Sequence, residues 1–273
     1  MPEPASSAVW MAMTEASLVE RIAAAAEGIR GRVAMNPTVA LSLGGGTDAG
    51  RYFARRAAVD LDPLLGAPEG GGTHGELVFG ELGGTPTVVL AGRAGGSTPL
   101  RESTLPVRVA RQLGASALIV AGRAEVLNPK WEKSRLMLIV DHINLLGANP
   151  LVGPNDEKLG PRFPDMSGAY DSNFRRIAEE SARDRGIQLV RGVYIGRALP
   201  TASADEARLL SSFGGDAVGQ GIVAEVITAI HGGMRVLGLA ALEAQGAGSG
   251  SSSSGAGIGS SALEIIAAVV QRR

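Results

Sequence analysis

Few side chains in this sequence have the chemistry of a general acid, a general base or a nucleophile. The chain of 273 residues contains three histidines and no cysteine, which excludes a thiolate nucleophile and a thiolate-bound metal. His142 and His231 lie in segments typical of a structural scaffold, where a histidine usually has a fixed partner. His74, in the run GTHG at residues 72–75, is the remaining candidate for proton transfer.

Two glycine-rich turns follow predicted strands and could present backbone N–H groups to an anion. The first is GGGTD at residues 44–48, where Thr47 adds a hydroxyl and Asp48 adds a negative charge. The second is GRAGG at residues 92–96, which contains Arg93. A turn of this kind is equally typical of a tight connection between two elements, and Arg93 is equally suited to a structural ion pair. The pattern leaves both interpretations open.

Composition places the chain among globular proteins without a strongly charged partner. Hydrophobic residues make up 45% of the chain, enough for a full core in one domain spanning residues 1–273. The formal net charge of −1 gives no electrostatic footprint for nucleic acid or an anionic membrane. The first residues lack the basic region of a signal peptide, and no segment is long and apolar enough to cross a membrane. We expect a cytoplasmic protein that needs no cofactor or metal.

Short apolar runs alternate with helical patterns along the chain. Strand-like runs lie at 38–43, 87–91, 117–121, 136–140, 188–195 and 235–242, and helical patterns at 15–29, 105–113, 172–185, 204–212 and 222–231. This alternation predicts an α/β architecture with a mostly parallel or mixed sheet. A Gly/Ser-rich tract at 246–261 predicts a flexible segment before a last helix at 262–271.

Several sequence blocks resemble the trimeric class of purine nucleoside phosphorylases. The most informative block reads LLGANPLVGPNDEKLGPRFPDMSGAYD at residues 145–171. Further similar blocks lie at 75–86, 105–120, 127–129, 141–145 and 214–239, in the family's order. The resemblance implies a central mixed sheet that closes partly into a barrel and is flanked by helices, in a homotrimer or hexamer. It also implies a small-molecule ligand and descent from a glycosyltransferase that cleaves nucleosides with phosphate.

The resemblance places the family's phosphate-binding groups at positions that have changed in this chain. The family's Ser falls at Gly45, so Thr47 could supply a hydroxyl only in a shifted register. The family's Arg is kept as Arg93, whereas the His that follows it falls at Gly95. The chemistry of phosphorolysis therefore cannot be assumed from the fold that the resemblance implies.

A third anion-binding motif reads NAAGG in the family. The corresponding segment of this chain is GRAEV at residues 122–126. Two small positions have become Arg123 and Glu125. One interpretation is an ion pair on the surface. The interpretation that we favour is a charge pair that plugs or re-lines the phosphate site, because the resemblance places both side chains toward it.

The sugar and purine end of the implied site has also changed. The family's Met-Ser pair falls at Gln220 and Gly221, and its Asn falls at Ala244, next to Glu243. Phe163, in the tripeptide RFP, matches a Phe that the family contributes to the pocket of a neighbouring subunit. The alternative for Phe163 is a place in the core, but a loop rich in Gly and Pro tends to lie at the surface.

Three functions are consistent with these substitutions. The first is a diverged homologue without ordinary phosphorolysis, whose pocket takes another, less polar or larger small molecule in specialised biosynthesis. The second is a non-catalytic pseudoenzyme subunit that pairs with an active paralogue, and the third is a purine nucleoside phosphorylase with an unusual site. Side chains available for new chemistry or ligand binding are His74, Arg93, Arg123, Glu125, Arg197, Gln220 and Glu243.

Overall fold

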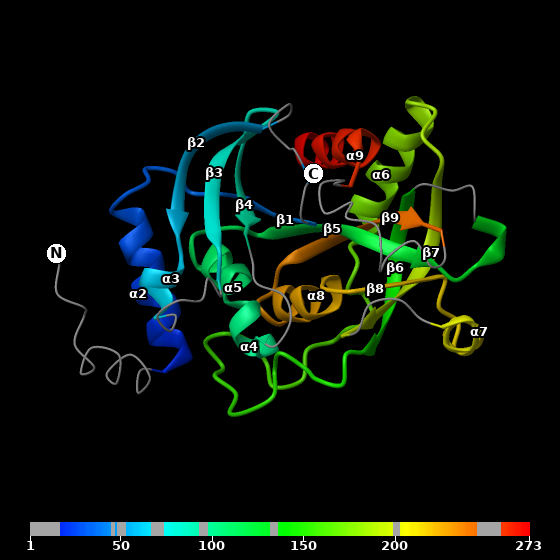
Figure 1. The fold of residues 1–273 in the computed structure, drawn as a ribbon. Helices are drawn as coiled ribbons and strands as arrows, with labels where there is room; N and C mark the ends of the chain where they lie inside the picture. Colours follow the sequence, from blue (N-terminus) through cyan, green and yellow to red (C-terminus); the bar gives the residue numbers. More distant parts are fainter. Residues whose placement is uncertain are drawn as a thin grey trace, which may run out of the picture.

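The computed structural model describes residues 17–44, 47, 53–66, 74–92, 98–131, 136–198, 203–244 and 258–273. Within these residues the chain forms one sheet with helices on both of its faces (Figure 1). The expected α/β class with a mixed sheet is confirmed.

The sheet has nine strands, and part of it is closed. The strands are β1 (Val39–Leu43), β2 (Phe53–Asp60), β3 (Glu76–Leu82), β4 (Thr85–Ala91), β5 (Ala117–Val126), β6 (Leu136–Leu145), β7 (Leu189–Arg197), β8 (Ala217–Gly219) and β9 (Arg235–Glu243). Their order is β2-β3-β4-β1-β5-β8-β7-β6-β9, and an additional pairing of β5 with β9 closes the last five strands into a barrel. The partial barrel that the sequence predicted is therefore present.

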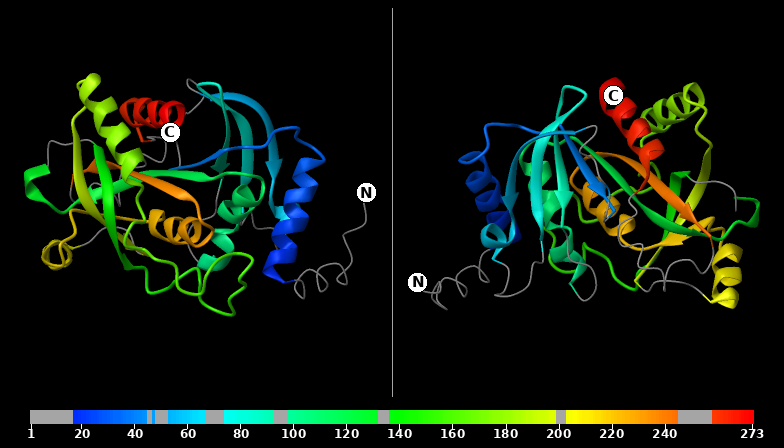
Figure 2. Two further views of the ribbon diagram at one scale, coloured as in Figure 1. Left: turned by 180° about the vertical axis from the view of Figure 1, so that it is seen from behind. Right: turned by 45° about the horizontal axis from the view of Figure 1, so that its top comes forward.

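Helices cover the two faces of the sheet as separate groups. They are α2 (Leu18–Arg30), α3 (Asp62–Leu65), α4 (Leu100–Ser103), α5 (Leu105–Gln112), α6 (Ser172–Asp184), α7 (Ala204–Ser212), α8 (Ile222–His231) and α9 (Ser260–Arg272). Buried side chains of α2, α5 and α8 share one hydrophobic core, and those of α6 and α9 share a second. Figure 2 shows α6 and α9 side by side and α8 on the other side of the barrel.

The start of α6 is tied to the start of β9 by a short polar network. Asp171 caps the helix by accepting the Phe174 N–H at 2.9 Å, and it accepts a bond from Arg235 Nε at 2.7 Å. The guanidinium of Arg235 also lies 4.0 Å from the centre of the Phe174 ring. The hydrogen bond from Arg235 lowers the pKa of Asp171. These contacts hold α6 against the edge of the barrel.

Several elements extend beyond their predicted ranges or were not predicted. The first helix begins at Leu18 and ends at Arg30 rather than spanning 15–29, and α9 begins at Ser260, inside the tract expected to be flexible. Residues 246–257 of that tract lie outside the described residues. The strand predicted at 117–121 runs on to Val126.

β2 was not predicted because its sequence lacks an apolar run. Arg55 and Arg56 are exposed in the middle of the strand, and burial is concentrated at Phe53 and Val59. The pairing of β2 with β3 therefore depends on the tertiary structure around it, because its own sequence has no alternating apolar pattern.

Replacing the fully buried Phe174 by Ala should lower the free energy of unfolding by about 3–5 kcal/mol, because the cavity lies in the core beneath α6. Urea unfolding followed by circular dichroism measures this change. Phe213→Ala is the matched control, since Phe213 is 55% exposed, and we expect a cost below about 1 kcal/mol. Equal costs at the two positions would contradict the assigned core.

Candidate functional site

An ion pair joins the C-terminal ends of β5 and β9. Arg123 contacts the carboxylate of Glu243 through both Nε and Nη2. The two strands are parallel, and Glu125 lies opposite Glu243 in their register. Since alternate residues of a strand face the same way, Arg123 and Glu125 share one face of β5. The face thus carries one cation and two carboxylates.

The ion pair is only partly exposed to solvent. The side chains of Arg123 and Glu243 are 32% and 25% exposed. Each charge has therefore lost part of its hydration, and the attraction of its partner compensates for that loss. The sequence predicted a charge pair around Arg123 and Glu125; the structure shows that Arg123 has its ion-pair partner on the neighbouring strand.

The first glycine turn lies beside this ion pair. The Gly44 N–H donates to the Ala121 carbonyl at 2.8 Å, and a Cβ on Gly44 would lie 3.5 Å from the Cα of Gly122. The Thr47 hydroxyl donates to the Gly44 carbonyl at 2.7 Å and accepts the Ile258 N–H at 3.3 Å. Thr47 is thus next to the site, and its hydroxyl stabilises the turn.

Polar residues at the ends of β7 and β8 border the same region. Gln220 follows β8 and donates through Nε2 to the Ala198 carbonyl at 2.7 Å, and Arg197 Nη2 lies 3.3 Å from Glu206 Oε1. A Cβ on Gly219, the last residue of β8, would lie 2.6 Å from the Arg123 carbonyl oxygen. This close approach requires glycine and brings β8 against Arg123.

Gly221 and Ala244 leave space at this end of the barrel. Gly221 has a φ of 93° at the start of α8, and a Cβ placed there would meet no atom within 4 Å. Ala244 directly follows β9 and is exposed. The small residues therefore widen the region, while Arg123 and Glu243 occupy its wall.

Phe163 lies on the long loop between β6 and α6 and is 86% exposed, so it is not a core residue. It stands beside Arg162, whose guanidinium is 5.7 Å from the ring centre. A pocket of about 970 Å³, part of it open solvent, includes Phe163, His142, Val152 and Met166 in its lining. An exposed aromatic side chain on a surface loop is available to another molecule.

Comparison with known proteins identifies the family to which this chain belongs. A model described as the phosphorylase superfamily matches residues 47–270. Purine nucleoside phosphorylase 1 of Geobacillus stearothermophilus is 45% identical over 176 residues, which cover 63% of this chain and 64% of that relative. The purine nucleoside phosphorylase of Rattus norvegicus is 41% identical over 230 residues, 80% of this chain and 79% of the relative. This chain belongs to the purine nucleoside phosphorylase family.

Solved structures of family members share the fold. A purine nucleoside phosphorylase of Schistosoma mansoni in complex with a monocyclic inhibitor matches with a TM-score of 0.82 at 25% identity, over 95% of this chain and 99% of that one. The chain aligns with 64% of the length of each of the relatives from Geobacillus stearothermophilus and Bacillus subtilis. Membership of the family is thus shown, and the fold is that of its members.

His74 lies in a network of its own. Its ring is 2% exposed, with Nδ1 3.0 Å from Asp62 Oδ1 and Nε2 3.3 Å from Glu102 Oε2. Arg21 of α2 donates to both oxygens of Glu102 at 2.9 Å. The hydrogen bond from His74, together with Arg21, lowers the pKa of Glu102 to about 2. Both ring nitrogens are engaged, so a reaction that used His74 would first have to break one of these contacts.

A buried carboxylate near the glycine turn was not predicted. Glu225, in the first turn of α8, is 4% exposed and accepts the Ser42 hydroxyl at 2.5 Å. A carboxylate at this position is favoured by the N-terminus of the helix. The only sequence signal was an acidic residue within the apolar run IVAEVITAIH.

Three candidate positions, Gly45, Arg93 and Gly95, lie outside the described residues. Within the described part of the chain, no group of three or more His, Asp or Glu side chains has the arrangement of a metal site. No helix in that part is long and apolar enough to span a membrane.

Glu102→Gln should remove a pH-dependent contribution to stability. The pKa of Glu102 falls from 4.5 to about 2 in the folded chain, so its ionised form stabilises the fold above about pH 4.5 and this stabilisation is lost as the pH falls toward 2. The urea midpoint of the variant should lie below that of the wild type at pH 7, and the gap should narrow below about pH 4.5 and close toward pH 2. Glu157→Gln, on an exposed loop, is the control, and its gap should not change with pH. A difference between the urea midpoints of the wild type and Glu102→Gln that did not change with pH would contradict the hydrogen-bond network of Glu102.

Proposed function

We propose that this chain is a diverged purine nucleoside phosphorylase homologue that has lost ordinary phosphorolysis, and that its pocket now takes another small molecule. The observation that carries the proposal is the ion pair between Arg123 and Glu243. It lies where the resemblance places part of the phosphate site.

The charges around Arg123 oppose the binding of inorganic phosphate. Among the described residues of this face, Arg123 is the cation and Glu125 and Glu243 are two carboxylates. A unit charge about 4 Å from a phosphate oxygen costs about 4 kcal/mol at the effective dielectric constant typical of a protein surface. A cradle for phosphate instead needs donors that are not already engaged.

Most of the other polar atoms described at the site are engaged within the chain. The Thr47 hydroxyl donates to a backbone carbonyl, and so does the Gln220 amide. Arg197 pairs with Glu206 through Nη2, whereas its buried Nη1 has no partner among the described residues. A ligand that needs few donors from the protein fits such a site better than phosphate does, and the space beside Gly221 could hold an apolar group of that ligand.

A pseudoenzyme subunit is the second candidate, and exposed Phe163 favours it. A subunit without chemistry of its own could still offer this ring to the pocket of an active paralogue. In that case the chain would increase the activity of its partner and show none alone.

The proposal predicts no phosphate-dependent cleavage of inosine or guanosine. Purified protein is assayed for release of the base with and without phosphate, beside Arg93→Ala and the surface control Arg208→Ala. Turnover near 1–100 s⁻¹, within the range of ordinary enzymes, that is lost only in Arg93→Ala would contradict the proposal and indicate a phosphorylase with an unusual site. Base release without phosphate would indicate a different reaction at the same pocket.

The family resemblance implies an oligomer larger than a dimer, and the exposed Phe163 offers an apolar contact for it. Light scattering should give the mass of three or six chains, and Phe163→Ser should shift the population toward smaller species because it removes an apolar contact. Phe213→Ser removes another half-exposed ring, on the chain that follows α7, and should leave the mass unchanged. A monomeric wild type would contradict the prediction.

A further inference from the structure

Within the described residues, two side chains that line the same pocket each have a buried polar atom without a hydrogen-bond partner. These atoms are Nε of Arg108 on α5 and Oγ1 of Thr228 on α8. Arg108 is 7% exposed and Thr228 is 1% exposed. A hydroxyl in a helix commonly bonds to the carbonyl one turn earlier, and Thr228 does not. Unpartnered buried polar atoms are rare and need an explanation.

The pocket lies at the end of the barrel away from the ion pair. Its volume is about 700 Å³, part of it open solvent. In its lining, Gly114 lies three residues before the start of β5 and Met234 directly precedes β9, whereas Arg123 and Glu243 lie toward the far ends of these strands. The separation along β5 is about 20 Å at roughly 3.3 Å per residue. The pocket is therefore distinct from the candidate site described above.

Cationic side chains line this pocket without an opposing carboxylate. Arg108, Arg111 and Lys158 belong to the lining, and none of its described residues is Asp or Glu. Arg111 uses Nε to hold the Gly232 carbonyl at 2.8 Å, which leaves its two terminal nitrogens available. The nearby carboxylate of Glu20 accepts the Ser17 N–H at 2.8 Å as part of a helix cap. The charge that faces the pocket is thus positive.

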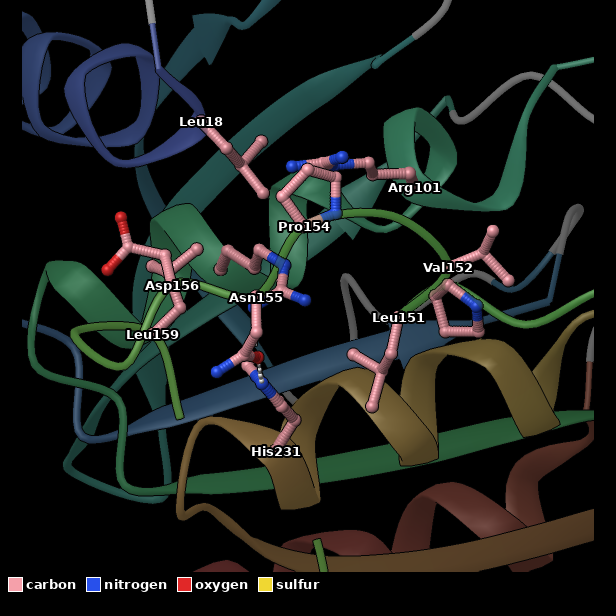
Figure 3. Close-up of a pocket in the computed structure, with 11 residues that line it drawn as sticks. Leu18, Arg101, Leu151, Val152, Pro154, Asn155, Asp156, Leu159 and His231 are labelled. Carbon is pink, nitrogen blue, oxygen red and sulfur yellow. Dashed lines mark hydrogen bonds between the residues drawn. The ribbon is translucent and has the colours of Figure 1, made fainter. Parts of the chain in front are cut away.

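The other side of Arg108 faces a smaller pocket, shown in Figure 3. Nη1 of Arg108 donates to Nδ1 of His231 at 3.2 Å, and Nε2 of His231 lies 3.4 Å from Asn155 Oδ1. An arginine can only donate, so Nδ1 accepts and the proton of the neutral ring is on Nε2. Burial and the charge of Arg108 lower the pKa of His231, which favours this neutral form.

The position of Arg108 is fixed, and its charge is kept. Burial, with a contribution from Arg101, lowers its pKa to about 10, so it is still protonated at neutral pH. Gly160 holds the adjoining loop against the end of α8, since a Cβ there would lie 1.9 Å from the His231 carbonyl oxygen. That loop carries Lys158 and Leu159 into the pocket wall. Arg108 is thus held in place before any ligand binds.

We infer that this pocket binds a small organic phosphate. Guanidinium groups and an ammonium group are the donors that proteins use for phosphate oxygens, and the Thr228 hydroxyl adds a neutral donor. Ile22, Val107, Leu159 and Met234 form apolar walls beside them. These walls fit the organic part of the ligand, so an organic phosphate binds more tightly than inorganic phosphate.

The test uses phenyl phosphate as the probe, with inorganic phosphate and phenol as its two halves. Isothermal titration at constant ionic strength measures each Kd for the full chain. Phenyl phosphate is expected to bind at least about tenfold more tightly than either half, because it uses both the cations and the apolar walls. Failure of phenyl phosphate to bind at 10 mM, or equal binding by inorganic phosphate, would overturn the inference.

Three variants locate the binding. Thr228→Val keeps the shape of the side chain and removes a hydroxyl that has no partner among the described residues, so it should fold normally and weaken the binding of phenyl phosphate by about fivefold or more. Arg108→Gln should weaken it by more than about tenfold. Arg208→Gln makes the same charge change on α7, where the side chain is 75% exposed, and should leave the Kd unchanged.

If Arg108→Gln does not fold, Thr228→Val still decides the outcome. A wild-type Kd in Thr228→Val, with its thermal midpoint also unchanged, would overturn the inference by placing the probe elsewhere. The result of the nucleoside-cleavage assay does not affect this test, because the titration does not depend on catalysis.

Discussion

The parallel pairing of β5 with β9 is the interaction on which the rest of the structure depends. It closes five strands into a barrel, and its register places Glu125 opposite Glu243. Because the two strands run in the same direction, their C-terminal ends meet at one end of the barrel, where Arg123 joins Glu243. The residues that precede them, Gly114 and Met234, meet at the other end, where they line the cationic pocket. One pairing therefore determines the position of two chemically different regions.

The fold can keep its stability while its site changes, because the two depend on different groups. Two hydrophobic cores, one on each face of the sheet, hold the helices in place. The pair of Arg123 and Glu243 lies at the rim, where partial exposure limits the cost of losing water. An ion pair at the rim of a barrel changes the stability of the fold little. It changes the binding of an anion much more, since the carboxylate of the pair repels the anion.

The sequence predicted most of the elements whose burial shows in a local pattern, although β3 was missed despite its buried run from Leu77 to Gly80. The helix that carries Phe174 has a cap and a regular apolar face, so its range was predicted closely. β2 was missed, because Arg55 and Arg56 interrupt any apolar run. The candidate site could be placed only through the resemblance, and Glu243, which pairs with Arg123, is 120 residues away along the chain. A periodic pattern along the sequence cannot indicate a contact between residues so far apart.

The helix α8 shows how buried polar side chains mark function in this fold. It is apolar almost throughout, yet Glu225, Thr228 and His231 are all buried in it. Burying such a group without a partner costs about 1–3 kcal/mol. Glu225 has the Ser42 hydroxyl, and His231 is held on both ring nitrogens. Thr228 has no partner within the described part of the chain. The unpartnered hydroxyl of Thr228 therefore agrees with the inference that a molecule from outside the chain meets this helix at the cationic pocket.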